Sequence, residues 1–309
     1  MSRFLIVGAG PVGTETATAL LEAGHEVAVL TRSGSRPVLD GVRRIAADAS
    51  DADALTEAAM GSAAIVNCAN PGDYTTWSEV WPPLAESLLT AAERTGATLV
   101  TAAALYPYGP VDTPMVEGMP DRATDRKGVI RAGMWAEAKA RHDAGRIRAV
   151  EVRASDYVGT GVGPNGHITR QLPTAVRGKA AWVVGDPDLP HTWTDVHDMG
   201  RTLAAVAVRP ETWGQIWHAP SQPPRTQRQV LTEVLAAADL PPVALHTMPK
   251  PLLGLVGLVQ PLVREINESG YMFRRSYVMD SARSQRELGL APSPWADTCR
   301  RTAQGNPGL

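Results

Sequence analysis

The first residues of the chain restrict most strongly what it can fold into. An apolar run, Phe4–Val7, leads directly into three glycines with the spacing Gly8-x-Gly10-x-x-Gly13, and a helix-like run follows over 14–23. A strand, a glycine-rich turn and a helix in this order form a loop in which a dinucleotide can bind. The start of the chain therefore predicts the first unit of a parallel α/β sheet with a nucleotide at its edge.

Each residue of this loop has a distinct physical role. Gly8 permits the tight turn, Gly10 lets the backbone approach a pyrophosphate, and Gly13 lets the helix pack closely on the strand. Pro11 suits an early helical position because its missing N–H has no helical partner there. Val12 lies in the first turn, where free N–H groups and the helix dipole attract phosphates. We expect all five residues to contact the cofactor.

Short apolar runs alternate with helical runs through the first half of the chain. This alternation is typical of an α/β fold, a doubly wound parallel sheet with helices on both faces. The predicted strands are Phe4–Val7, Glu26–Leu30, Val42–Ala46, Ala63–Cys68, Ala97–Thr101 and Arg148–Val152, and the predicted helices are Val12–Ala23, Asp51–Ala59, Glu79–Thr95 and Gly133–Ala144.

The second half is less regular and predicts a smaller, interleaved substrate domain. We assign residues 1–160 to the dinucleotide-binding domain, with 181–220 adding later strands, and residues 161–309 to the substrate-binding region. The apolar segment 249–263 is too short to span a membrane, so a buried helix or a pocket wall is favoured. The other predicted elements are helices over 168–176, 196–208 and 230–238 and strands over 181–184 and 216–218.

Composition excludes several classes of function. The chain has 309 residues and a net charge of -2, so neither nucleic acid nor an anionic membrane is an expected partner. Its two cysteines form no disulfide framework, and no metal-ligand motif occurs. The sequence shows no signal peptide, which predicts a cytoplasmic location. Abundant Ala, Gly, Pro and Arg suggest a high-GC bacterial source.

The residues after the early strands indicate which nucleotide binds. Arg32 follows the second strand, where an NAD-binding chain usually offers a carboxylate, and a guanidinium suits a 2′-phosphate. We therefore expect NADP, with NAD less favoured. Asp48 follows the third strand and can accept from the adenine amino group. Asn67 and Ala69 end the fourth strand, where small residues leave room for the adenosine.

These motifs together resemble the extended short-chain dehydrogenase/reductase family, which is the NAD-dependent epimerase/dehydratase group and is close to NmrA-like proteins. The resemblance covers most of the chain up to about Trp217 and implies a Rossmann fold. Asp48 matches the family's acidic residue after strand three. The segments that match family motifs are Leu105–Pro110, Arg153–Gly159 and His191–Asp198.

The chain departs from the family pattern at the residues that transfer protons. The family uses a Tyr-x-x-x-Lys pair on a helix and a hydroxyl residue after strand five, and the i, i+4 spacing puts the pair on one helical face. Here the match is Trp135-x-x-x-Lys139, and Ala103 lies where a hydroxyl is expected. The resemblance implies that Lys139 binds the nicotinamide ribose and acts beside the reacting groups. Indole does not titrate usefully, so Trp135 is expected to shape the pocket.

Three other residues are candidates for the missing acid or base. Tyr106 and Tyr108 follow strand five, and Asp156 lies where the family has asparagine. Each has a structural alternative: packing of an aromatic loop for the tyrosines, and a turn-forming role for the aspartate. We expect the substrate pocket to be lined by Trp135, Ala103, Tyr157, His167 and Trp193.

The sequence thus predicts an NADP-binding, atypical short-chain dehydrogenase/reductase. The favoured activity is that of an oxidoreductase or epimerase on a small carbonyl or hydroxyl substrate, with a homodimer as a possible assembly. Two alternatives stay open: a non-redox isomerase, lyase or cyclase on the same fold, and a non-enzymatic NADP sensor.

Overall fold

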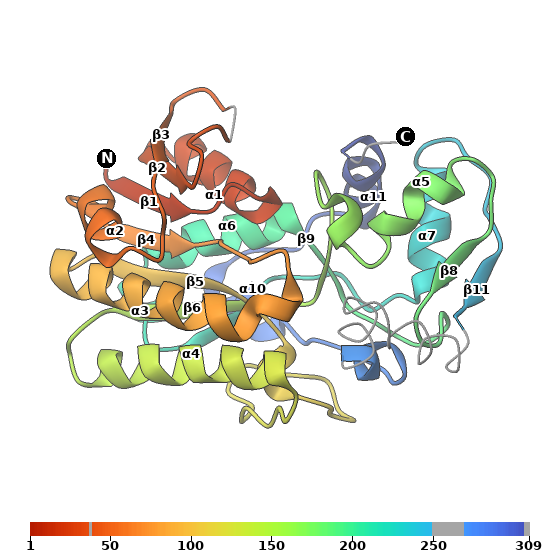
Figure 1. Ribbon diagram of the computed structural model, residues 1–309. Helices are drawn as coiled ribbons and strands as arrows, with labels where there is room; N and C mark the ends of the chain where they lie inside the picture. Colours follow the sequence, from red (N-terminus) through yellow and green to blue (C-terminus); the bar gives the residue numbers. More distant parts are fainter. Residues whose placement is uncertain (37–38, 249–268, 306–309) are drawn as a thin grey trace.

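Seven parallel strands form the centre of the molecule, in the order β10-β6-β5-β4-β1-β2-β3 (Figure 1). The computed structural model describes residues 1–36, 39–248 and 269–305, so the prediction for 249–263 lies outside the described residues. The strands are β1 (Arg3–Val7), β2 (Glu26–Thr31), β3 (Val42–Ala46), β4 (Ala64–Asn67), β5 (Thr98–Ala104), β6 (Ala149–Ala154) and β10 (Ile216–His218).

Helices cover both faces of this sheet, which confirms the doubly wound α/β fold. Helices α1 (Pro11–Glu22) and α6 (Val196–Ala207) cover one face, and α2 (Ala52–Ala59), α3 (Trp77–Thr95) and α4 (Arg126–Asp143) cover the other. Successive residues of β1 point to opposite faces and all four after Arg3 are buried. Strands buried on both faces read as continuous apolar runs, which explains the pattern in the sequence.

A second lobe lies beside the sheet and has an apolar core of its own (Figure 1). Two small parallel pairs, β8 with β11 and β7 with β9, belong to this side of the molecule. Of the strands within 181–220, β10 joins the main sheet, whereas β8 and β9 pair outside it. The elements are α5 (Leu172–Ala175), α7 (Gln227–Ala236), α10 (Ala282–Leu288), α11 (Trp295–Gln304), β7 (Asp156–Val158), β8 (Ala181–Val183), β9 (Trp193–Asp195) and β11 (Leu245–Thr247).

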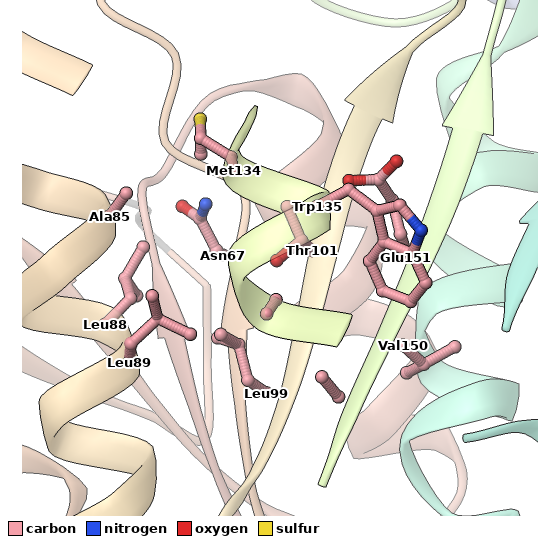
Figure 2. Close-up of a pocket in the computed structure, with 12 residues that line it drawn as sticks. Asn67, Ala85, Leu88, Leu89, Leu99, Thr101, Met134, Trp135, Val150 and Glu151 are labelled. Atoms are coloured by element: carbon pink, nitrogen blue, oxygen red, sulfur yellow. The ribbon is translucent and has the colours of Figure 1, made fainter. Parts of the chain in front are cut away.

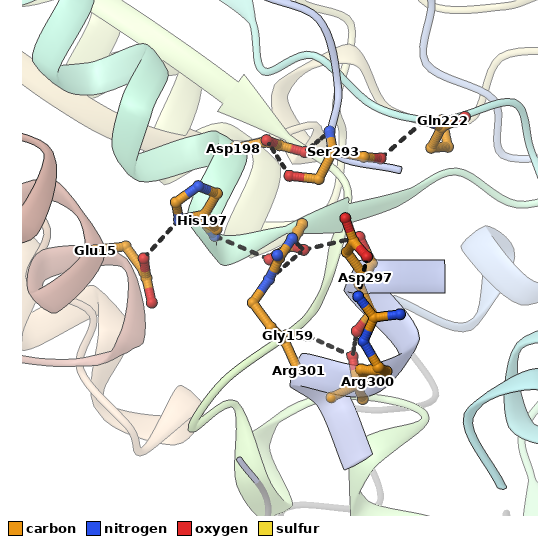
Figure 3. A network of polar contacts seen from close by, with 12 residues as sticks. Glu15, Gly159, His197, Asp198, Gln222, Ser293, Asp297, Arg300 and Arg301 are labelled. Atoms are coloured by element: carbon orange, nitrogen blue, oxygen red, sulfur yellow. Dashed lines mark hydrogen bonds and ion pairs between the residues drawn. The ribbon is translucent and has the colours of Figure 1, made fainter. Parts of the chain in front are cut away.

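A polar network joins the last helix to the sheet's helices (Figure 3). Asp195 caps the N-terminus of α6 and accepts a hydrogen bond from the hydroxyl of Thr298 in α11, 2.8 Å away. Arg301 of α11 forms an ion pair with the same carboxylate. On the other side of α6, His197 bonds to Glu15 of α1 at 2.9 Å. Helix α11 is therefore held against α6, which in turn is bonded to α1.

The structure differs from the predicted elements mainly at α4. This helix begins at Arg126, seven residues before the predicted start, and Asp125 caps it by accepting from the Gly128 N–H at 3.0 Å. Glycines at 128 and 133 and several charged residues hide the helical period there. Within the described ranges, no helix is long and apolar enough to cross a membrane.

Candidate active site

The glycine loop has the geometry that its spacing predicts. The Gly8 N–H donates to the Leu30 carbonyl of β2 at 3.0 Å, and Gly8 has φ of +102°, a conformation that favours glycine. A Cβ on Gly13 would lie 2.1 Å from the Gly8 carbonyl oxygen, so only glycine fits there. A Cβ on Gly10 would meet nothing within 4 Å. The open side of Gly10 is thus the side available to a ligand.

The residues around this loop fit a dinucleotide. Helix α1 begins at Pro11, and Gly10 provides no side-chain cap, so the first-turn N–H groups face the loop. Asn67 at the end of β4 is fully buried and accepts from the Ala69 N–H at 3.2 Å. Its Nδ2 has no partner among the described residues, so a buried donor remains beside the loop.

The adenosine side of the loop carries two exposed charges. Arg32 and Asp48 follow the neighbouring strands β2 and β3, and both are exposed. Hydrogen bonds from the Ser50 backbone and hydroxyl lower the Asp48 pKa, burial opposes this weakly, and the charge of Arg32 lowers it further. The arrangement can offer both a cation and an acceptor to the ribose end of a nucleotide.

The structure does not support the roles predicted for Trp135 and Lys139. Lys139 lies thirteen residues after the start of α4, about 20 Å along its axis from the carboxyl edge of the sheet. Its side chain is 39% exposed, and its ammonium forms an ion pair with Asp143 at 2.6 Å. Figure 2 shows the Trp135 indole beside Glu151 of β6, where it lines a cavity of about 20 Å³ between the sheet and helices α3 and α4. The late predicted start of α4 caused this misplacement.

Tyr108 is also not available for proton transfer. It is 0% exposed, and its hydroxyl shares a hydrogen bond of 2.8 Å with His218 Nε2. The Arg153 guanidinium lies over its ring, 4.5 Å from the centroid. Burial raises the Tyr108 pKa strongly, although the charge of Arg153 opposes this. Tyr108 is therefore part of a buried structural network, as the packing alternative predicted.

Tyr106 lies where the two halves of the molecule meet. It is partly buried and packs against both the core of the second lobe and the α2–α3–α4 side of the sheet. Its ring centroid lies 6.4 Å from that of Trp77. Ala103 is buried at the second-last position of β5, with no hydroxyl to offer. Tyr106 thus stays a candidate for the missing acid or base at the carboxyl edge of the sheet.

Asp156 begins β7, directly after β6, and pairs with His191, a residue of the family-like segment His191–Asp198 for which the sequence suggested no catalytic role. His191 Nε2 lies 2.8 Å from Asp156 Oδ2. Burial alone raises the Asp156 pKa, but the hydrogen bond and charge of His191 outweigh it, so the pKa lies below its usual value. Tyr157 is next in the chain, and burial raises its pKa well above the usual value. The carboxylate is thus ionised at neutral pH.

His167 and Trp193 lie in the wall of the second lobe. His167 stacks on Phe273 with ring centroids 3.7 Å apart and bonds to Gln227 at 2.7 Å. Trp193 is 3% exposed, and its indole N–H donates to the Arg225 carbonyl at 2.9 Å. Trp193 is therefore a core residue, which contradicts its predicted place in the pocket lining.

The environment of His167 predicts a pH-dependent stability. Burial lowers its pKa to about 4, so the folded chain binds fewer protons than the unfolded chain between pH 6.5 and 4. Stability then falls as pH drops through this window, by roughly 3 kcal/mol from this residue. Urea unfolding at pH 7 and pH 4 should show the parent losing that much more than His167→Gln. An equal loss of stability in the parent and in His167→Gln would contradict the lowered pKa of His167.

Sequence reasoning missed a cluster of polar groups near the same edge. The hydroxyls of Tyr271 and Tyr277 and the Asp125 Oδ2 atom are buried and have no hydrogen-bond partner among the described residues. Burial raises the Tyr277 pKa, and the nearby charges of Tyr271 and Asp156 raise it further. Only the capping position of Asp125 was readable from sequence, since no motif ties the two tyrosines to this edge. Within the described ranges no His, Cys, Asp or Glu cluster could hold a metal ion.

Comparison with known proteins agrees with this geometry. The family model described as the NAD dependent epimerase/dehydratase family matches residues 4–217. No protein of curated function matches the chain.

Solved structures share the fold over nearly the whole chain. MoeE5 in complex with UDP-glucose and NAD has a TM-score of 0.80 at 19% identity, covering 98% of both chains. DesIV, a dTDP-glucose 4,6-dehydratase from Streptomyces venezuelae with NAD and TYD bound, has a TM-score of 0.76 at 22% identity, covering 98% of this chain and 96% of its own. UDP-glucose 4-epimerase from Thermotoga maritima has a TM-score of 0.79 at 14% identity, covering 98% and 97%. With its family model matched over more than half its length, the chain belongs to the NAD-dependent epimerase/dehydratase family of enzymes.

Proposed function

We propose that the protein is an NADP-dependent oxidoreductase or epimerase that acts on a small carbonyl or hydroxyl substrate. One observation carries this proposal. The glycine loop, with the open side of Gly10, lies at the same carboxyl edge as Tyr106 and Asp156. Ligands of open α/β sheets bind at this edge, near the point where the strand order reverses. Bound NADP supplies hydride transfer there.

The protein's own contribution is to hold the cofactor and to move a proton. The open side of Gly10 lets the backbone approach the phosphates, the first turn of α1 offers them its N–H groups, and Asn67 adds a side-chain donor next to them. With the Asp156 pKa lowered, its carboxylate is suited to accept a proton rather than to donate one. Tyr106 is then the candidate proton donor.

The cofactor preference rests on Arg32. An exposed guanidinium after β2 can make paired, charge-assisted hydrogen bonds to a 2′-phosphate, whereas the Asp48 carboxylate after the neighbouring strand is already bonded to Ser50. The solved relatives named above carry NAD, so the preference for NADP is this chain's own prediction.

Removing Arg32 tests the preference directly. We expect Arg32→Ala to weaken NADPH binding about tenfold, because it loses charge-assisted bonds worth about 1.5–3 kcal/mol before solvent screening. NADH binding should stay unchanged. Fluorescence titration with both cofactors measures this, and Arg36→Ala provides a matched exposed arginine as control. Equal losses for NADPH and NADH would refute the assignment.

Cofactor turnover tests the function itself. We expect a change in NADPH absorbance with at least one member of a panel of small carbonyl compounds. Tight NADPH binding without turnover across the panel would contradict the proposal. The absence of a hydroxyl at Ala103 favours, as a second candidate, a non-redox isomerase or lyase on the same fold. Product formation without net NADPH consumption would identify it. The homodimer, the cytoplasmic location and the bacterial source stay predictions.

A further inference from the structure

His191 is a buried histidine whose backbone is paired on both edges. Its N–H donates to the Arg225 carbonyl at 3.2 Å, and its carbonyl accepts from the Arg225 N–H at 2.9 Å. On the other edge the chain pairs with Tyr277, whose carbonyl accepts from the Thr192 N–H at 2.9 Å. The backbone that carries the His191 side chain is therefore held by two different segments of the chain.

The imidazole ring of His191 is packed among aromatic rings. Phe273 and Tyr277 stack on it, with ring centroids 4.9 and 5.1 Å away and interplanar angles of 9° and 28°. The Trp193 ring lies 4.6 Å away at a tilt of 39°. His191 is 2% exposed, so the ring has no open space in which to turn. The direction of its Nε2 atom is set by this packing.

The ring directs Nε2 at one oxygen of Asp156, Oδ2, which lies 2.8 Å away. An ionised carboxylate can only accept hydrogen bonds, so Nε2 carries the proton and donates it. Among the described residues nothing donates to the other oxygen, Oδ1, and the Asp156 side chain keeps an exposed fraction of 23%. One oxygen is thus held, and the other is open to a ligand.

No other neighbour of Asp156 can replace His191. Burial raises the Asp156 pKa, and the hydrogen bond and charge of His191 are the strongest effects that lower it. Burial lowers the pKa of His167 to about 4, so this second histidine carries no charge at neutral pH. Burial also raises the pKa of both neighbouring phenols, which stay protonated. The titratable and charged groups that face Asp156 are His191, His167, Arg170, Tyr157 and Tyr277.

We propose that His191 is a positioning residue for Asp156: its Nε2–H holds Oδ2 in place, so that Oδ1 accepts the proton that the substrate releases. A base whose direction is fixed by packing and by a second hydrogen bond is what efficient proton transfer requires. Phe273 and Tyr277 of the second lobe thereby help to orient a base that lies directly after β6. This inference rests on the proposed function for the substrate, but the state of the carboxylate can be measured without one.

Carbon NMR of the chain with isotope-labelled aspartate, without ligand, follows the Asp156 carboxyl from pH 7 to pH 4. Asp156→Asn assigns the resonance. In the parent we expect a midpoint below the ordinary value of 3.8, so the carboxylate stays ionised over the whole range. His191→Phe keeps a flat ring in the stack but removes the donor, so burial should move the midpoint above 3.8.

Two further variants make the result specific. His191→Gln keeps an N–H donor at a similar distance from the backbone, and its midpoint should lie between those of the parent and His191→Phe. His197→Phe is the matched control, because it breaks another histidine–carboxylate pair, to Glu15 at 2.9 Å, and should leave the Asp156 resonance unchanged. Circular dichroism at each pH confirms folding, and the smaller His191→Leu repeats the measurement if His191→Phe does not fold.

Two results would overturn the proposal: a parent midpoint above 3.8, or the same midpoint in the parent and in the variants without a donor. With a turned-over substrate, His191→Phe should lower kcat about tenfold to a hundredfold with little change in KM, which is part of what a positioned base contributes. Its activity should also decline at a higher pH than that of the parent. Absence of turnover in the parent would count against the proposed function alone, because the carboxyl titration needs no substrate.

Discussion

Gly10→Ala is expected to fold like the parent chain and yet to bind the dinucleotide about tenfold to a hundredfold more weakly. A Cβ at this position meets no protein atom within 4 Å, and Gly10 has φ of −73°, which alanine adopts freely. The added methyl group therefore projects only toward the ligand. Overpacking of a close contact costs about 1–3 kcal/mol, which gives the expected range of affinity.

The neighbouring glycine provides the contrasting result. A Cβ on Gly13 would lie 2.1 Å from the Gly8 carbonyl oxygen, so Gly13→Ala must displace α1 from β1. We expect this variant to lose stability, with or without cofactor. Urea unfolding and NADPH titration of both variants separate the two effects. A Gly10→Ala chain that binds NADPH as tightly as the parent would show that the cofactor does not pass over this loop.

The doubly wound fold was predictable because its strands are buried on both faces. Leu5 and Ile6 are both apolar although they point to opposite faces of the sheet. Such a continuous apolar run can be recognised in the sequence without knowing any tertiary contact. The glycine loop was predictable for a similar reason, since its constraints are local. Gly8 has a positive φ, and Gly13 lies too close to the Gly8 carbonyl for a Cβ. Both constraints act within six consecutive residues.

Trp135 and Lys139 were misplaced because their position depends on where α4 begins. Asp125 is a capping residue, but the turns after it contain Gly128 and charged side chains that read as a loop. Lys127 and Arg131, in the first two turns of α4, have the same i, i+4 spacing. The choice of Trp135 and Lys139 followed from the family's Tyr-x-x-x-Lys pattern, whose lysine Lys139 matches.

The second lobe shows the limit of local patterns most clearly. The strands β7, β8, β9 and β11 have three residues each, which is too short for a period to appear. The pairing of His191 with Asp156 joins residues 35 positions apart through two of these strands. Only the tertiary fold brings them together, so the sequence could suggest Asp156 but not its partner.

Arg153→Met is expected to destabilise the chain by about 3–5 kcal/mol, the usual effect of breaking a buried ion pair. Arg153 has no exposed surface, and its guanidinium bonds to Glu151 at 2.7 Å and to both oxygens of Asp121 at 2.6 and 3.0 Å. Without it, the Glu151 carboxylate, which is 3% exposed, stays buried with no cation beside it. Arg153 lies in β6, three residues before Asp156, so the position of Asp156 at the carboxyl edge of the sheet should become less fixed as well.

Two further variants make this prediction specific. The double variant Arg153→Met/Glu151→Gln removes the uncompensated charge and should recover part of the lost stability, because the cost lies in burying the lone carboxylate. Arg228→Met breaks an ion pair with Asp188 whose side chains are 45% and 57% exposed, and it should cost less than about 1 kcal/mol. Urea unfolding of the four chains measures all three differences. If Arg153→Met lowered the free energy of unfolding no more than Arg228→Met does, the buried ion pairs of Arg153 would contribute little to stability.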